Sequence, residues 1–164
     1  VASAKIAGNY ASPLSPLAEA DKDGFAQLIW TDAATHEFIE EAGTANLIFV
    51  LNGKLVTPSV RSTVLDGVTR DTIIQLAKKA GVEVEERRVS VKEVIAGIEN
   101  GTLTDAFAAG TAATVTPIGE IGYQGKTYTL ADPATRTISA GIAKALNDIR
   151  YGLAPDEFGW NWVL

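Results

Sequence analysis

An Asn-Gly pair at residues 52–53 constrains the fold of this 164-residue chain more than any other feature. It separates two apolar, β-prone runs, residues 45–51 and 54–57, and Pro58 ends the second run. The central residues of the tightest hairpin turns need positive φ, which Asn and Gly adopt readily. The pattern therefore predicts an antiparallel hairpin near the middle of the first half, followed by a loop over residues 59–66.

Capping residues and glycines mark the expected helices. Their starts and stops are Ser15-Pro16 with Gly24, Gly67 with Gly81, Ser90 with Gly101, and Asp132-Pro133 with Gly152. The third helix has the most specific start, because Ser90 and Glu93 have the spacing of a capping box.

Short β-prone runs between these helices predict the remaining strands. They cover residues 26–31, 37–41, 82–89, 104–109 and 113–118, and a second hairpin over residues 123–129 turns at Gln124-Gly125. Hairpins interleaved with helices favour a mixed α/β domain with a largely antiparallel sheet over a doubly wound parallel one. Residues 156–164 hold two of the three tryptophans and are expected to pack against the domain.

Composition excludes several classes of partner and site. The length favours one domain or a large piece of one, and 46% hydrophobic residues argue against disorder. A net charge of -6 argues against nucleic acid or an anionic membrane as a partner. No apolar run reaches membrane-spanning length. The absence of cysteine and the presence of a single histidine, His36, exclude a disulfide framework and argue against a metal site.

Four groups of residues could carry chemistry. Lys5 lies among small apolar residues, and poor solvation there would favour the neutral, nucleophilic amine. The segment 67–69 opens a helix and could bind an anion through free N–H groups. The other groups are the carboxylates Glu40 and Glu41 and the small-residue turn at residues 110–112.

Each group also has a plainer interpretation. These are a surface lysine, an ordinary loop-to-helix junction, a pair of solvated loop carboxylates, and a bulge or tight turn. His36 lies in a polar turn and is expected at the surface. Together with the phenol of Tyr10, however, the groups supply what pyridoxal phosphate requires: an amine, a carboxylate, an anion-binding helix start and a small-residue loop.

The segment Lys5-Ile6-Ala7-Gly8-Asn9-Tyr10 resembles the Schiff-base segment of the class IV, pyridoxal-phosphate-dependent aminotransferases, and of branched-chain aminotransferases in particular. The resemblance implies that Lys5 forms the Schiff base and shuttles the proton between Cα and C4′. It implies that Tyr10 hydrogen-bonds the phenolic oxygen of the cofactor and that Glu41 pairs with the pyridine nitrogen. Glu40 falls where the family varies.

Further segments follow in the family's order. Leu65-Asp66-Gly67-Val68-Thr69-Arg70 is similar to the Leu-x-Gly-Val/Ile-x-Arg segment. This implies that the N–H groups of Val68 and Thr69, next to Gly67, hold the phosphate and that Leu65 packs on the ring.

Gly110-Thr111-Ala112 resembles the family's Ser/Ala-Gly-Thr-Ala turn, which implies that Thr111 reaches the phosphate and that the backbone of Thr111 and Ala112 helps to receive the substrate carboxylate. Thr44 is implied in the same carboxylate or phosphate contact. The close of the chain, Tyr151-Gly152 and Phe158-Gly159-Trp160, resembles the tail of the longer branched-chain subgroup.

The resemblance also implies the organisation of the whole protein. Residues 1–164 are expected to form the large domain of the D-amino-acid-aminotransferase-like fold, a mostly antiparallel pseudo-barrel sheet with surrounding helices. The chain has no methionine and its motif starts at residue 5, so the N-terminal small domain is expected to be missing from it. The family pattern implies a cytoplasmic homodimer. The Cys-x-x-Cys of some members is replaced by Ala113 and Thr116, which excludes a redox switch of that kind.

The expected activity is ping-pong transamination between leucine, isoleucine or valine and 2-oxoglutarate, with branched-chain amino acids and 2-oxo acids as small-molecule partners. Two alternatives stay open. The chain is either a folded fragment without turnover, or it belongs to a related class IV enzyme, a D-amino acid aminotransferase or an aminodeoxychorismate lyase.

Overall fold

The computed structural model describes residues 4–11, 13–112 and 114–162, and the expected hairpin lies at its centre. Strands β3 (Asn46–Leu51) and β4 (Lys54–Pro58) pair antiparallel. Asn52 and Gly53 turn between them with φ of 52° and 76°, which confirms the prediction.

Three more strands complete a five-stranded sheet around this hairpin. β7 (Leu103–Gly110) pairs antiparallel with β3, and β8 (Thr114–Pro117) pairs antiparallel with β7. β5 (Val84–Arg87) lies parallel to β4. The strand order is therefore β5-β4-β3-β7-β8.

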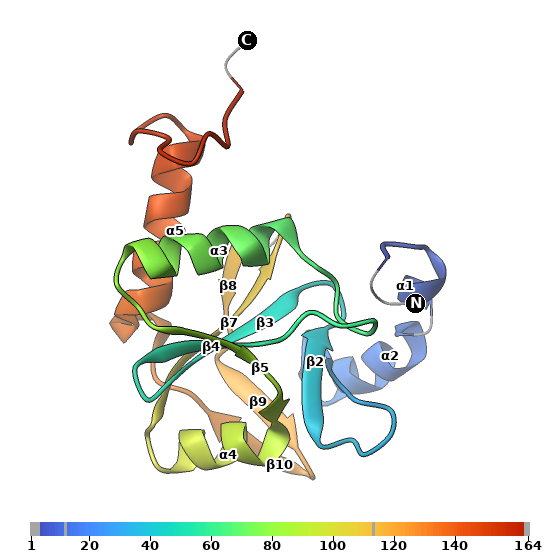
Figure 1. Cartoon of the computed structure of the whole chain (residues 1–164). Helices are drawn as coiled ribbons and strands as arrows, with labels where there is room; N and C mark the ends of the chain where they lie inside the picture. The colour runs from blue at the N-terminus through green and yellow to red at the C-terminus, as the bar shows by residue number, and fades with distance from the viewer. Residues whose placement is uncertain (1–3, 12, 113, 163–164) are drawn as a thin grey trace.

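Both faces of the five-stranded sheet are covered (Figure 1). Leu47 and Phe49 belong to a core cluster with α4 (Val91–Glu99), β9 (Glu120–Tyr123) and β10 (Lys126–Thr129). Ile48, between them, belongs to a second cluster with α3 (Val68–Lys79) and α5 (Thr137–Arg150). All six residues of β3 are buried, and the apolar run 47–51 suits a strand that is covered on both faces.

A smaller sheet lies beside the first. It has the order β1-β2-β6, with β1 (Ile29–Thr31), β2 (Phe38–Ala42) and β6 (Val89–Ser90) pairing antiparallel. The expected mixed α/β class with mostly antiparallel strands is confirmed, because β4–β5 is the one parallel pair among the described strands. The described strands form separate sheets and do not close into a barrel.

Several element boundaries differ from the sequence-based expectation. The helix expected from Ser15 is α2 (Leu14–Lys22), with Pro13 at its N-cap in helical conformation and no side-chain cap, and a short helix α1 (Gly8–Ala11) precedes it. The strand expected from residue 26 begins only at Ile29, because residues 26–28 pair with no strand in the described part of the chain. Ala113, expected to begin a strand, lies outside the described residues.

Two further element boundaries differ from the expectation. The expected strand 82–89 is two strands, because the chain leaves β4 after Arg87 and pairs with β2 from Val89. Asp132-Pro133 begins a separate 3₁₀ helix (Pro133–Thr135), and α5 starts at Thr137.

The cap at Ser90 is confirmed in part. The Ser90 Oγ accepts the Glu93 N–H at 3.0 Å, as a capping box requires. The Glu93 carboxylate, however, binds the Arg87 guanidinium at 2.6 Å. The Glu93 carboxylate, which a capping box would direct back to the helix start, thus binds a residue of the neighbouring strand β5.

No helix in the described ranges combines the length and apolar character that a bilayer crossing demands.

Candidate active site

A cavity of about 240 Å³ brings together segments that are far apart in the sequence. The connection between β2 and β3, the loop that enters α3, and the end of β7 all line it. It contains eight of the residues singled out from the sequence: Lys5, Glu41, Thr44, Leu65, Gly67, Val68, Thr69 and Thr111.

The remaining predicted residues are placed differently. Ala112 is exposed and does not line this cavity, although its neighbour Thr111 does. The backbone of Tyr10 belongs to α1, and its side chain lies outside the part that the structure describes.

Of the two interpretations of Lys5, a poorly solvated amine and a surface lysine, the structure shows the surface lysine. Lys5 is exposed, in a segment with local hydrogen bonds such as Asn9 Nδ2 to the Ala4 carbonyl at 2.8 Å. A small-residue sequence around a lysine does not bury it unless other elements cover the segment.

Glu41 is a half-buried carboxylate on β2, facing the cavity. Its Oε2 accepts the Leu65 N–H at 3.1 Å. Burial raises the pKa of the Glu41 carboxyl and the charge of Glu40 adds to this, whereas the hydrogen bond from Leu65 lowers it. A cation close to this carboxylate would favour its charged form and oppose the rise in its pKa.

The start of α3 faces the same cavity. Gly67 is its N-cap, with φ of -79° and ψ of 127°, and no side chain caps the helix. The first N–H groups of a helix have no intrahelical acceptors, and the helix dipole is positive there. Since Val68 and Thr69 line the cavity, this end of α3 is suited to bind an anion.

Asn46 is a site residue that the sequence analysis missed. It is buried at the start of β3, lines the cavity, and donates from Nδ2 to the Leu65 carbonyl at 2.9 Å. The signal that could have revealed it is an amide at the first position of an otherwise apolar strand, because a buried amide needs partners.

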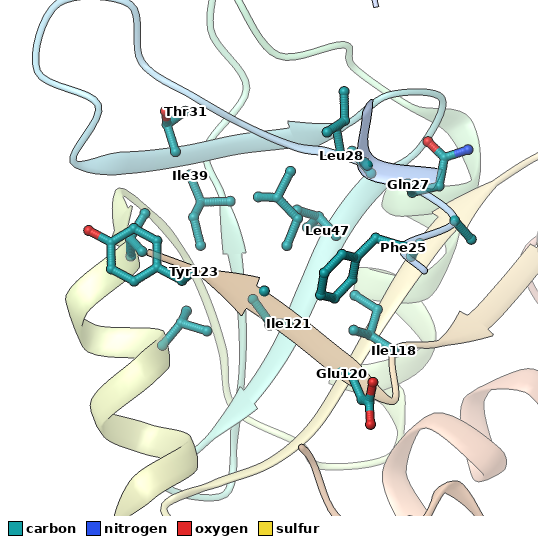
Figure 2. Close-up of a pocket in the computed structure, with 18 of the residues that line it drawn as sticks. Phe25, Gln27, Leu28, Thr31, Ile39, Leu47, Ile118, Glu120, Ile121 and Tyr123 are labelled. Atoms are coloured by element: carbon teal, nitrogen blue, oxygen red, sulfur yellow. The ribbon is translucent and has the colours of Figure 1, made fainter. Parts of the chain in front are cut away.

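A larger cavity of about 800 Å³ lies behind the β2–β3 connection, and Figure 2 shows apolar side chains from β2, β3 and β9 around it. Ala42, Thr44 and Ala45 line both cavities, so this connection separates them. Lys5, Glu41 and the start of α3 contact only the smaller cavity. The amine, the carboxylate and the anion-binding helix start are therefore gathered in the smaller cavity, whereas other polar residues, among them His36, Glu120 and Tyr123, line the larger one.

Two further observations concern side chains that could bind a metal ion. His36 is exposed, as expected. Among the described residues, no group of three or more His, Asp or Glu side chains could hold a metal ion.

The family model and the sequence relatives that match this chain are all described as aminotransferases. Residues 2–121 match the family model described as "Amino-transferase class IV". The branched-chain-amino-acid aminotransferase 2 of Bacillus subtilis (strain 168) is 40% identical over 157 residues, which are 96% of this chain and 43% of that protein. A probable branched-chain-amino-acid aminotransferase of Streptomyces coelicolor is 42% identical over 161 residues, 98% of this chain and 44% of that protein.

Solved structures agree with the sequence relatives. The branched-chain amino acid aminotransferase of Escherichia coli has a TM-score of 0.82 at 32% identity and covers 98% of this chain and 50% of its own. The Thermobaculum terrenum enzyme in its PLP form has a TM-score of 0.75 at 29% identity, over 93% of this chain and 46% of its own. The chain thus spans about half the length of the relatives it matches. Because the family model covers most of its residues, the chain belongs to the class IV aminotransferase family.

Proposed function

We propose that this chain is the cofactor-binding large domain of a branched-chain-amino-acid aminotransferase. The observation that carries the proposal is that Lys5, the half-buried Glu41 and the uncapped start of α3 line the same cavity. The names of the sequence relatives support branched-chain amino acids as amino donors. From the family resemblance we extend the proposal to 2-oxoglutarate as acceptor, a small N-terminal domain outside this chain, and a cytoplasmic homodimer.

The groups around the cavity fit pyridoxal phosphate. Free N–H groups at a helix start suit a phosphate dianion. A carboxylate whose pKa is raised by burial is stabilised by a protonated pyridine nitrogen. Leu65, an apolar residue, lines the same cavity.

When bound, pyridoxal phosphate supplies an aldehyde that condenses with amines and a ring that accepts the electron pair released at the substrate Cα. In the proposal, the Lys5 amine holds the aldehyde and later moves the proton at Cα. The Glu41 carboxylate keeps the ring nitrogen protonated.

The family resemblance assigns the remaining parts of the cofactor and the substrate to further groups. The N–H groups of Val68 and Thr69 bind the phosphate together with the Thr111 hydroxyl. Thr44 and the backbone at Thr111-Ala112 orient the substrate carboxylate. The resemblance also assigns to the Tyr10 phenol, which lies outside the described side chains, a hydrogen bond to the phenolic oxygen of the cofactor.

The cofactor site is tested by visible absorption of the chain with added pyridoxal phosphate, then borohydride reduction and peptide mapping. We expect a reducible yellow species attached to Lys5, and its loss in Lys5→Ala. Lys22→Ala removes an exposed lysine of the neighbouring α2 and should leave the adduct unchanged. An adduct on other lysines, with Lys5 unmodified, would break the assignment.

Turnover is tested with the chain alone and with the chain fused behind the N-terminal half of the Bacillus subtilis relative. The fusion should transaminate leucine, isoleucine and valine, and Lys5→Ala should abolish this activity. Equal activity of the Lys5→Ala fusion would refute the enzymatic role. A preference for D-amino acids, or lyase activity on aminodeoxychorismate, would move the protein to one of the related class IV enzymes.

A further inference from the structure

We infer that Asn46 is a positioning residue that sets the start of α3 against the strand carrying Glu41, and so couples the two ends of the cofactor site. The inference rests on the proposed function, because it assigns a role within that site. Three features carry it: the backbone hydrogen bonds of Leu65, the position of the loop before α3, and the absence of a side chain at Gly67.

Both backbone polar groups of Leu65 are bound by side chains of the β2–β3 segment. Its N–H donates to Glu41 Oε2 at 3.1 Å, and its carbonyl accepts from Asn46 Nδ2 at 2.9 Å. Asn46 is only 5% exposed, so its amide has little access to water that could replace this bond. The loop into α3 therefore takes its position from the same segment that presents Glu41.

Asn46 also explains the glycine at position 67. The φ of -79° at Gly67 is open to any residue, so backbone conformation does not require glycine there. A Cβ at this position would lie 2.1 Å from Asn46 Oδ1, well inside contact distance, whereas the next side chain, Arg70, would be at 3.6 Å. The close approach of Asn46 is what excludes a side chain.

The body of α3 is fixed independently of Asn46. Arg70, buried in its first turn, donates to the Pro58 carbonyl at 3.0 Å and to Glu86 at 2.9 Å. Loss of the Asn46 contact should therefore loosen residues 65–69 without undocking the helix. The consequence falls on the N–H groups of Val68 and Thr69, which are proposed to hold the phosphate.

The test measures how strongly the chain distinguishes pyridoxal phosphate from pyridoxal, which lacks the phosphate, by absorbance titration. We expect Asn46→Ala to lower the ratio of the two affinities by about five- to tenfold, since a buried positioning hydrogen bond is lost. The matched control is Thr57→Val. Thr57 is a buried β4 residue that donates to the Leu47 carbonyl at 2.8 Å, away from the cavity. Loss of the Thr57 hydroxyl should lower the thermal midpoint of unfolding and leave the ratio of the two affinities unchanged.

A second set of variants tests the packing without any ligand. Gly67→Ala should lower the thermal midpoint by roughly 5 °C, because its Cβ collides with Asn46. In the double variant with Asn46→Ala the collision is absent, so the combined shift should be smaller than the sum of the single shifts. Additive shifts, or an unchanged affinity ratio in Asn46→Ala, would overturn the inference.

A failure of the proposed function can be distinguished from a failure of the positioning role. If the chain takes up no pyridoxal phosphate, hydrogen exchange of the Leu65 N–H decides the positioning role alone. Faster exchange in Asn46→Ala than in Thr57→Val supports the role, and equal exchange overturns it.

Discussion

Burial raises the pKa of the Glu41 carboxyl, so the charged form is less favourable in the folded chain than in the unfolded one. A raised folded pKa means that the folded chain holds the proton more tightly. The stability from this group is fully present below the unfolded pKa and is lost as the pH rises through the raised folded value. At neutral pH Glu41 therefore destabilises the ligand-free fold, and a cationic ligand nitrogen would offset this.

Replacing Glu41 with glutamine should separate stability from binding. The glutamine side chain retains an oxygen that accepts the Leu65 N–H but carries no charge, so Glu41→Gln should raise the thermal midpoint of the ligand-free chain at pH 8 by about 2–4 °C. Its affinity for pyridoxal phosphate should fall roughly 10- to 100-fold, because the charge-assisted partner of the ring nitrogen is lost. Melting curves and absorbance titrations measure the two effects.

The adjacent carboxylate provides the control. Glu40 accepts from Thr63 Oγ1 at 2.6 Å and does not line the cavity. Glu40→Gln should leave cofactor affinity within about twofold of the wild type, since it removes only a charge that acts on Glu41 through space. The stabilisation by Glu41→Gln should shrink towards pH 4, where the unfolded carboxyl is itself largely protonated. A gain that persisted undiminished at pH 4 would contradict the linkage.

At the scale of elements, a buried ion pair joins β7 to the start of α5. Asp105 and Arg136 lie 3.3 Å apart and are both nearly inaccessible to solvent. Asp105 Oδ2 also accepts the Ser139 N–H at 3.1 Å, so a strand residue caps the first turn of α5. The Arg136 guanidinium also donates to the carbonyls of Ala131 and Ala106.

Removing Asp105 should be among the most destabilising single changes in the chain. Asp105→Ala leaves the Arg136 charge buried without a counter-ion and α5 without its cap, which predicts a loss of about 3–5 kcal/mol of unfolding free energy. Urea unfolding monitored by circular dichroism measures it. The exposed pair Lys144–Asp148 on the same helix is the control, and Lys144→Ala should cost less than about 1 kcal/mol. Similar losses for both variants would contradict the assigned role of burial.

This pair also shows which elements could be predicted from the sequence. Local signals sufficed where the deciding interaction is local: Asn52-Gly53, the Ser90 cap and the glycine that follows α3. They failed where a distant segment decides, as at the start of α5, which Asp105 caps from 34 residues away. The break at Arg87 has the same origin, because β5 and β6 pair with different sheets.

The site follows the same division at the scale of the whole molecule. Motif resemblance identified eight residues that line one cavity, because the family's order of motifs carries information about tertiary structure that local propensity lacks. Asn46 was missed, since its role depends on the loop at Leu65 folding back onto β3. Small neighbouring residues did not decide between a poorly solvated and a surface Lys5, because solvation depends on which elements cover a segment, and Lys5 is exposed.

The C-terminal tail packs against the α3–α5 side of the molecule for part of its length. The rings of Phe158 and Trp160 stack 4.2 Å apart and nearly parallel, and both pack against the second core cluster. Lys79 of α3 lies over the Phe158 ring at 5.3 Å and pairs with Glu157 at 2.8 Å. Trp162, two residues further on, is 93% exposed. The expectation that the tail packs is thus confirmed for Phe158 and Trp160 but wrong for Trp162.

The two tryptophans form a matched pair for testing this arrangement. Trp160→Ala removes a half-buried ring that closes the second core cluster and should cost about 1–3 kcal/mol of unfolding free energy. Trp162→Ala should cost less than about 0.5 kcal/mol, since the ring leaves water only slightly. Urea unfolding followed by far-ultraviolet circular dichroism compares them without relying on tryptophan fluorescence. Equal costs would mean that the stacked pair does not seal the core, and a larger cost at Trp162 would place the packed end of the tail beyond Trp160.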